Sequence, residues 1–226
     1  MTAHFVSLLE ELTRRSLRMA AQVEDILAEA CETIFDASEA LALRVIRRDH
    51  EVDQAEVEVE SEVIRLLALY QPVGVDLRLL CTILKVNNNL ERVADCAVNV
   101  AERARHGQLQ LVARESAELK QLCPVVRQAL RDAVQAYAQD DAALARSVAT
   151  QDNAIDALYG QIIRDVVAHP ERTAANMAAY LDLLSVAKNL ERIADHATNI
   201  AEDVIYLATG KIVRHQARGG DAPTRG

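Results

Sequence analysis

The sequence predicts an all-α protein of six helices, built from two repeated antiparallel three-helix bundles. Hydrophobic residues make up 50% of the 226-residue chain but aromatic residues only 3%, with seven Gly, four Pro and no Trp. A core made of Ala, Leu, Val and Ile is typical of helical proteins. Apolar residues recur at helical spacing almost throughout, and no run alternates with period two for long enough to indicate a strand.

An internal duplication predicts the two halves. Residues 89–102 recur as residues 189–202, and ten of the 14 paired positions are identical, which establishes a repeat at an offset of 100. Residues 49–53 match residues 152–156 at an offset of 103. The offset therefore falls from 103 to 100 at the loops that contain Pro72 and Pro170, where the two copies differ in length. Two copies of one bundle tolerate such a difference best in a surface connection.

Breaks in the apolar pattern mark the helix ends in order. The first long helix is interrupted at Asp36-Ala37-Ser38, and the second ends at Gln71-Pro72-Val73-Gly74 because proline cannot continue a helix. Gly107 is the C-cap glycine of the third helix. Asp140-Asp141 offers an N-cap between the fourth and fifth helices, and His169-Pro170-Glu171 separates the fifth from the sixth.

These breaks give three helices in each half. Short connections make successive helices antiparallel neighbours, so each half is most simply an up-down-up bundle. We therefore expect a first repeat at residues 1–107 and a second at residues 108–210. The polar segment 211–226 is expected to be a disordered tail beyond its first few residues.

Charge and cysteine content narrow the function. A net charge of −9 disfavours non-specific binding to nucleic acid or to an anionic bilayer. The first 20 residues contain five Arg and Glu side chains, which argues against a signal peptide or a membrane span. The four cysteines form no CxxC pair and fit core packing. We expect a soluble cytoplasmic protein with reduced thiols, no nucleic-acid partner and no membrane insertion.

Each repeat carries an acidic helix face. At about 100° per residue, four polar side chains of the first copy fall within roughly 80° of one another on the helix surface. They are Glu91, Asp95, Asn99 and Glu102, and the second copy repeats them as Glu191, Asp195, Asn199 and Glu202. Leu90 and Val93 lie on the other side, so the acidic face looks away from the bundle core.

The second helix of each half adds an acidic pair, and the combination predicts a metal site. Two carboxylates four residues apart destabilise a helix by about 0.2–0.5 kcal/mol, so a neutralising group is expected. Oxygen-rich clusters of this kind suit hard cations and iron or manganese. The predicted metal ligands are Asp49, Asp53, Glu91 and Asp95 in the first half, and Asp152, Asp156, Glu191 and Asp195 in the second.

Other interpretations fit the same faces. The acidic helix faces are also consistent with solvated surfaces whose charge is neutralised, without a metal, by Arg92, Arg103 and Arg192. Cys96 and His196 occupy equivalent positions but lie roughly 100° or more from the aspartates, so we interpret them as packing residues.

A ferritin-like di-metal protein is a competing hypothesis. Such proteins project Glu-x-x-His motifs into the bundle core. Here Glu191 and His196 are five residues apart, and the carboxylates look outward. The chain also has no Gly-rich phosphate loop and no nucleophile in a glycine elbow, which argues against catalysis. A metal-free helical scaffold with another partner is the third interpretation.

The duplication and its motifs resemble the PhoU family of phosphate-signalling regulators over about residues 1–210. The motifs are Asn89-Leu90-Glu91-Arg92-Val93-Ala94-Asp95, Asn189-Leu190-Glu191-Arg192-Ile193-Ala194-Asp195 and Gln71-Pro72-Val73-Gly74-Val75-Asp76-Leu77-Arg78. The family often has Asp before the motif leucine and Gly before the motif aspartate. This chain has Asn89, Asn189, Ala94 and Ala194 there, so one carboxylate in each motif becomes an amide.

The resemblance implies a cytoplasmic, non-enzymatic regulator, often a homodimer. It implies partnership with the ATPase of an ABC phosphate transporter and with a membrane sensor histidine kinase. Such a regulator represses phosphate uptake and the phosphate-starvation response when phosphate is plentiful. Some members of the family hold multinuclear iron or zinc clusters on their (Asp/Glu)-x-x-x-Asp faces, so the expected cofactor is multinuclear iron, zinc or manganese at the eight carboxylates named above.

Overall fold

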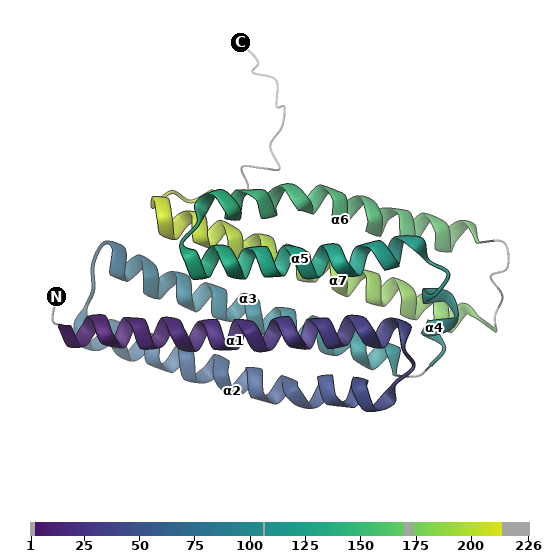
Figure 1. Cartoon of the computed structure of the whole chain (residues 1–226), viewed down its shortest axis with the longest axis horizontal. Helices are drawn as coiled ribbons and strands as arrows, with labels where there is room; N and C mark the ends of the chain where they lie inside the picture. Colours follow the sequence, from purple (N-terminus) through teal and green to yellow (C-terminus); the bar gives the residue numbers. More distant parts are fainter. Residues whose placement is uncertain (1–2, 106, 170–172, 174, 214–226) are drawn as a thin grey trace, which may run out of the picture.

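The structure, a computed structural model, describes residues 3–105, 107–169, 173 and 175–213. Within these residues it consists of helices and connecting turns without a strand, which confirms the predicted fold class. The helices are α1 (Ala3–Phe35), α2 (Glu39–Tyr70), α3 (Val75–Ala104), α4 (Leu109–Ala113), α5 (Ala117–Gln139), α6 (Ala142–Ala168) and α7 (Met177–Thr209). Figure 1 shows α1, α2 and α3 as one elongated bundle and α5, α6 and α7 as a second bundle beside it.

Local capping explains where the predicted breaks fall. The Oγ of Ser38 accepts a hydrogen bond from the Leu41 backbone N–H at 3.3 Å and begins α2. Asp141 begins α6 in the same way, because its carboxylate accepts from the N–H groups of Ala143 at 2.8 Å and Leu144 at 3.0 Å. Asp140, with φ of 51°, ends α5 in the left-handed region. The third helix ends at Ala104, before the predicted Gly107.

The short helix α4 was not predicted, and its contacts explain why. The amide of Gln110 is buried and donates hydrogen bonds to the carbonyls of Thr33 at 3.0 Å and Ala104 at 2.9 Å. The guanidinium of Arg114, just after α4, donates to the Phe35 carbonyl at 3.0 Å. These bonds satisfy terminal carbonyls of α1 and α3. They are tertiary contacts, so no periodicity within residues 109–113 indicates them.

The two bundles meet through antiparallel helix pairs. Lys85 on α3 forms an ion pair with Asp203 on α7 at 3.2 Å, whereas Arg103 near the other end of α3 lies 3.6 Å from Asp182. The hydroxyl of Tyr137 on α5 donates to Ser16 on α1 at 3.1 Å. Buried side chains of both bundles therefore form one continuous core.

Two expectations have no test in this fold. The boundary between residues 107 and 108 stays a prediction, and most of the expected tail, residues 214–226, lies outside the described residues. No helix in the described part of the chain is both long and apolar enough to cross a membrane.

Candidate functional site

The structure brings the four predicted carboxylates of the first half onto one surface, where α2 packs along α3. Burial raises the pKa of Asp49 to about 6, and the nearby charges of Asp53, Asp95 and Glu102 act in the same direction. These residues come from two helices, so the interhelical convergence expected from the sequence is present. We call this surface the first acidic face, and it consists of Asp49, Asp53, Glu56, Glu91, Asp95 and Glu102.

Two further carboxyl groups of the first acidic face show the same effect. Burial raises the pKa of Glu91, and the charges of Asp95, Glu56 and Asp53 raise it further. Burial also raises the pKa of Glu56, with Glu60 and Asp53 adding to the shift. In all three groups burial is the larger cause of the raised pKa, and repulsion between the carboxylates adds to it.

One guanidinium partly neutralises the first acidic face. The Nε of Arg92 lies 3.1 Å from Glu91 Oε2, and its NH1 donates to Asp95 Oδ2 at 3.0 Å. This bears out the expected side-by-side pairing for Arg92. Arg103 instead reaches Asp182 across the α3–α7 interface.

The second acidic face, formed by Asp152, Asp156, Glu191 and Asp195, is neutralised differently. Asp152 and Asp156 lie on α6 and the other two on α7, and these helices pack together. The ammonium of Lys188 donates to Glu191, and this hydrogen bond raises the pKa of Lys188, with Asp195 contributing. The equivalent position in the first half is Asn88. Sequence reasoning missed Lys188, although its spacing of three residues from Glu191 is the usual one for a helical ion pair.

The metal interpretation remains a prediction. Among the described residues, no three His, Cys, Asp or Glu side chains gather closely enough to surround one ion in their present rotamers. The donor chemistry of the first acidic face nevertheless fits a cation, because carboxylate oxygens from α2 and α3 share that surface and burial and mutual repulsion raise the pKa of Asp49 and Glu91.

Cys96 and His196 occupy packed positions on α3 and α7, which agrees with the packing interpretation. Cys96 is buried on α3, and the Nδ1 of His196 lies 3.0 Å from Asn89 Oδ1 across the α3–α7 interface. Asn89 also donates its amide to the Lys85 carbonyl at 2.9 Å, and Asn189 donates to Ser185 at 2.8 Å. An aspartate cannot make that donation when ionised, which gives the two amides a structural role.

The core does not resemble that of a ferritin-like protein. Among the described residues, the buried polar or charged side chains include a single carboxylate, Asp203. Asp203 forms an ion pair with Lys85. A di-metal carboxylate site needs several inward carboxylates, so the ferritin-like hypothesis lacks its ligand set.

Replacing Asp49 with Asn is expected to stabilise the metal-free protein above pH 6. The folded-state pKa of Asp49 lies above its ordinary value of 3.8, so the folded protein binds a proton more tightly than the unfolded chain does. Stability is therefore lost as pH rises from about 4 to about 6, and the variant avoids this loss. After allowance for solvent screening, we expect a gain of roughly 1 kcal/mol at pH 7.5.

Urea unfolding at pH 4 and pH 7.5 in chelator-treated buffer measures this effect. The two proteins should be nearly equally stable at pH 4. Asp165→Asn, at an exposed position of α6, is the matched control and should show no pH-dependent gain. A gain of the same size at both pH values would contradict the electrostatic explanation.

The repeat organisation and the fold both occur in known proteins. A family model described as the PhoU domain matches residues 16–104 and 119–204, one copy in each repeat. A phosphate-specific transport system accessory protein PhoU homolog of Pseudomonas putida is 37% identical over 92% of this chain and 81% of its own length. The homolog of Aquifex aeolicus is 36% identical over 92% and 94% of the two chains.

Solved structures agree with these relatives. The crystal structure of PhoU from Pseudomonas aeruginosa superposes with a TM-score of 0.85 at 34% identity, covering 92% of this chain and all of the other. A phosphate transport system regulatory protein PhoU from Streptococcus pneumoniae gives a TM-score of 0.84 at 27% identity, covering 92% and 99% of the two chains. With the family model matched in both repeats and relatives above 30% identity along most of the chain, this protein belongs to the PhoU family.

Proposed function

We propose that this protein is a cytoplasmic, non-enzymatic regulator of phosphate homeostasis. In this proposal it couples an ABC phosphate transporter, through the transporter ATPase, to a membrane sensor histidine kinase. It represses phosphate uptake and the phosphate-starvation response when phosphate is plentiful. The observation that carries the proposal is the match of both repeats to the PhoU domain, together with relatives that are named accessory proteins of phosphate-specific transport systems.

The acidic faces fit a role in binding and recognition. They lie on long helices of the two bundles, and the first acidic face carries carboxyl groups whose pKa values are raised by burial and by one another. A bound cation or a basic partner surface would relieve that repulsion. Homodimer formation is part of the proposal and would bring four such faces into one particle.

Iron, zinc or manganese is the proposed occupant of the acidic faces. Asp49, Asp53, Glu91 and Asp95 would hold it in the first half, and the equivalent carboxylates in the second. A metal there would neutralise charge and link α2 to α3. This chain's own contribution is to present carboxylates from two packed helices, with Arg92 as the competing cation.

Deletion of the gene in its native bacterium tests the regulatory role. We expect a phosphate-responsive reporter to be expressed in phosphate-rich medium, several-fold above the parent strain, because repression is lost. A plasmid carrying the wild-type gene should restore repression. Tagged protein should also capture the transporter ATPase and the sensor kinase from membranes. Unchanged reporter expression in the deletion strain would contradict the proposed function.

A further inference from the structure

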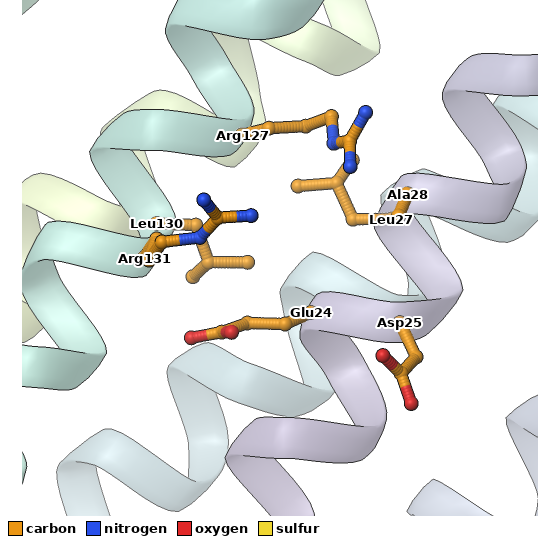
Figure 2. A pocket seen from close by; sticks show the side chains of 7 residues that line it. All are labelled: Glu24, Asp25, Leu27, Ala28, Arg127, Leu130 and Arg131. Atoms are coloured by element: carbon orange, nitrogen blue, oxygen red, sulfur yellow. The ribbon is translucent and has the colours of Figure 1, made fainter.

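A small cavity of about 110 Å³ lies between α1 and α5, where the two repeats meet away from the acidic faces. Its apolar floor includes Leu27 from α1 and Leu130 from α5. Figure 2 shows the guanidinium groups of Arg127 and Arg131 projecting from α5 into the space between the helices, with the carboxylate of Glu24 below Arg131. The cavity lining therefore holds two cations, Arg127 and Arg131, and two carboxylates, Glu24 and Asp25.

The repeat shows that these charges are a feature of one half only. Glu24 aligns with Arg127 at an offset of 103, the offset that relates residues 49–53 to residues 152–156. At the same offset, Leu27 aligns with Leu130 and Ala28 aligns with Arg131. The two leucines of the cavity floor are thus equivalent in the two repeats. The two arginines have no equivalent arginine in the first repeat, so the cations are specific to α5.

Both arginines are available to a ligand. Within the described part of the chain, neither guanidinium forms a hydrogen bond or an ion pair within 4.0 Å. Asp25, at the edge of the cavity, instead lies 3.7 Å from Arg48. Arg131 is close enough to lower the pKa of Glu24, although burial, the larger effect, raises it. Two cations four residues apart on a helix repel each other, and a bound anion would remove this cost.

We propose that Arg127 and Arg131 form a binding site for a small tetrahedral oxyanion, inorganic phosphate, in this cavity. Guanidinium groups match phosphate oxygens with paired, charge-assisted hydrogen bonds. The cavity is far smaller than the roughly 300–1,000 Å³ of pockets that enclose larger organic ligands, so it selects a free anion. Binding there would join α1 of the first repeat to α5 of the second.

Glu24 makes the site selective for phosphate over sulfate. At neutral pH phosphate retains at least one P–OH group, which can donate a hydrogen bond to a carboxylate. Sulfate has no such hydrogen and would place its oxygens against the Glu24 charge. A carboxylate beside two arginines thus weakens anion binding in general but favours a protonated anion. The assignment of phosphate as the ligand is based on Arg127, Arg131 and Glu24. A regulatory use of the site rests on the proposed function.

Equilibrium dialysis of the purified full-length protein against radiolabelled phosphate tests the proposal. We expect saturable binding of one phosphate per chain. Arg127→Gln and Arg131→Gln should each weaken it by about tenfold or more, because each removes a charge-assisted pair. Arg146→Gln, at an exposed position of α6, is the matched control and should bind as the wild type does. Circular dichroism establishes that every variant is folded.

Competition experiments test the ligand assignment. Sulfate should compete poorly with phosphate in the wild type, and Glu24→Gln should narrow this difference by about tenfold because its amide can donate to sulfate. Competition by AMP as strong as by phosphate would overturn the assignment to a free anion. Absence of saturable binding up to about 10 mM phosphate, or binding unchanged in both arginine variants, would overturn the site itself. The deletion strain tests repression separately, so the two proposals can fail independently.

Discussion

Replacing Leu90 with Ala is expected to destabilise the protein by about 2–5 kcal/mol, the usual cost of a leucine truncated in a packed core. Leu90 is fully buried on α3, and α3 packs against α1, α2 and α7. Because Leu90 is fully enclosed in close-packed side chains, the cavity left by the substitution has little freedom to collapse. Leu190→Ala, at the equivalent fully buried position of α7, should cost a similar amount.

Urea unfolding followed by circular dichroism measures both costs at one protein concentration. Leu181→Ala is the matched control, since the same truncation on α7 removes a side chain that is 58% exposed. The control should change stability by no more than about 0.5 kcal/mol. A cost below about 1 kcal/mol for Leu90→Ala would contradict tight packing around Leu90.

Protein purified without chelator is expected to contain iron, zinc or manganese that is lost in Glu91→Ala/Asp95→Ala. These carboxylates belong to the first acidic face, where Arg92 is the cation that a bound metal would have to displace from them. Elemental analysis by mass spectrometry measures the metal content. A metal present at 100 times its dissociation constant should also stabilise the protein by about 2.7 kcal/mol, and this stabilisation should disappear in the variant.

The second acidic face provides an internal comparison. Glu191→Ala/Asp195→Ala should also release metal, because these residues are the equivalent carboxylates of the second repeat. Glu58→Ala removes an exposed carboxylate of α2 outside both faces and should leave the metal content unchanged. Metal-free wild-type protein, with a stability that the paired substitutions do not alter, would contradict the metal proposal and leave the faces as surfaces for basic partners.

Local chemistry explains which parts of the fold were predictable. The breaks at Ser38 and Asp141 depend on side chains that cap the helix beginning next to them, so a short stretch of sequence contains the whole signal. The end of the second helix follows in the same way from Pro72. By contrast, α4 depends on hydrogen bonds from Gln110 to residues of α1 and α3, which are distant in the sequence.

The two candidate sites also differ in whether local sequence could predict them. The first acidic face was predictable because its carboxylates recur at helical spacing on two helices joined by a short turn. The cavity between α1 and α5 was not, because Arg127 and Arg131 read as ordinary helical charges until the packing of the two repeats places them opposite Glu24. Short connections predict which successive helices pack together. They do not predict how the first repeat packs against the second.

The ion pairs between α3 and α7 have a consequence for self-assembly. Helix α3 supplies both cations, Lys85 and Arg103, and α7 supplies both carboxylates, Asp203 and Asp182. A symmetric pair of identical repeats would place cation against cation or acid against acid at these positions. The two ion pairs therefore favour contact between unlike repeats over contact between like repeats.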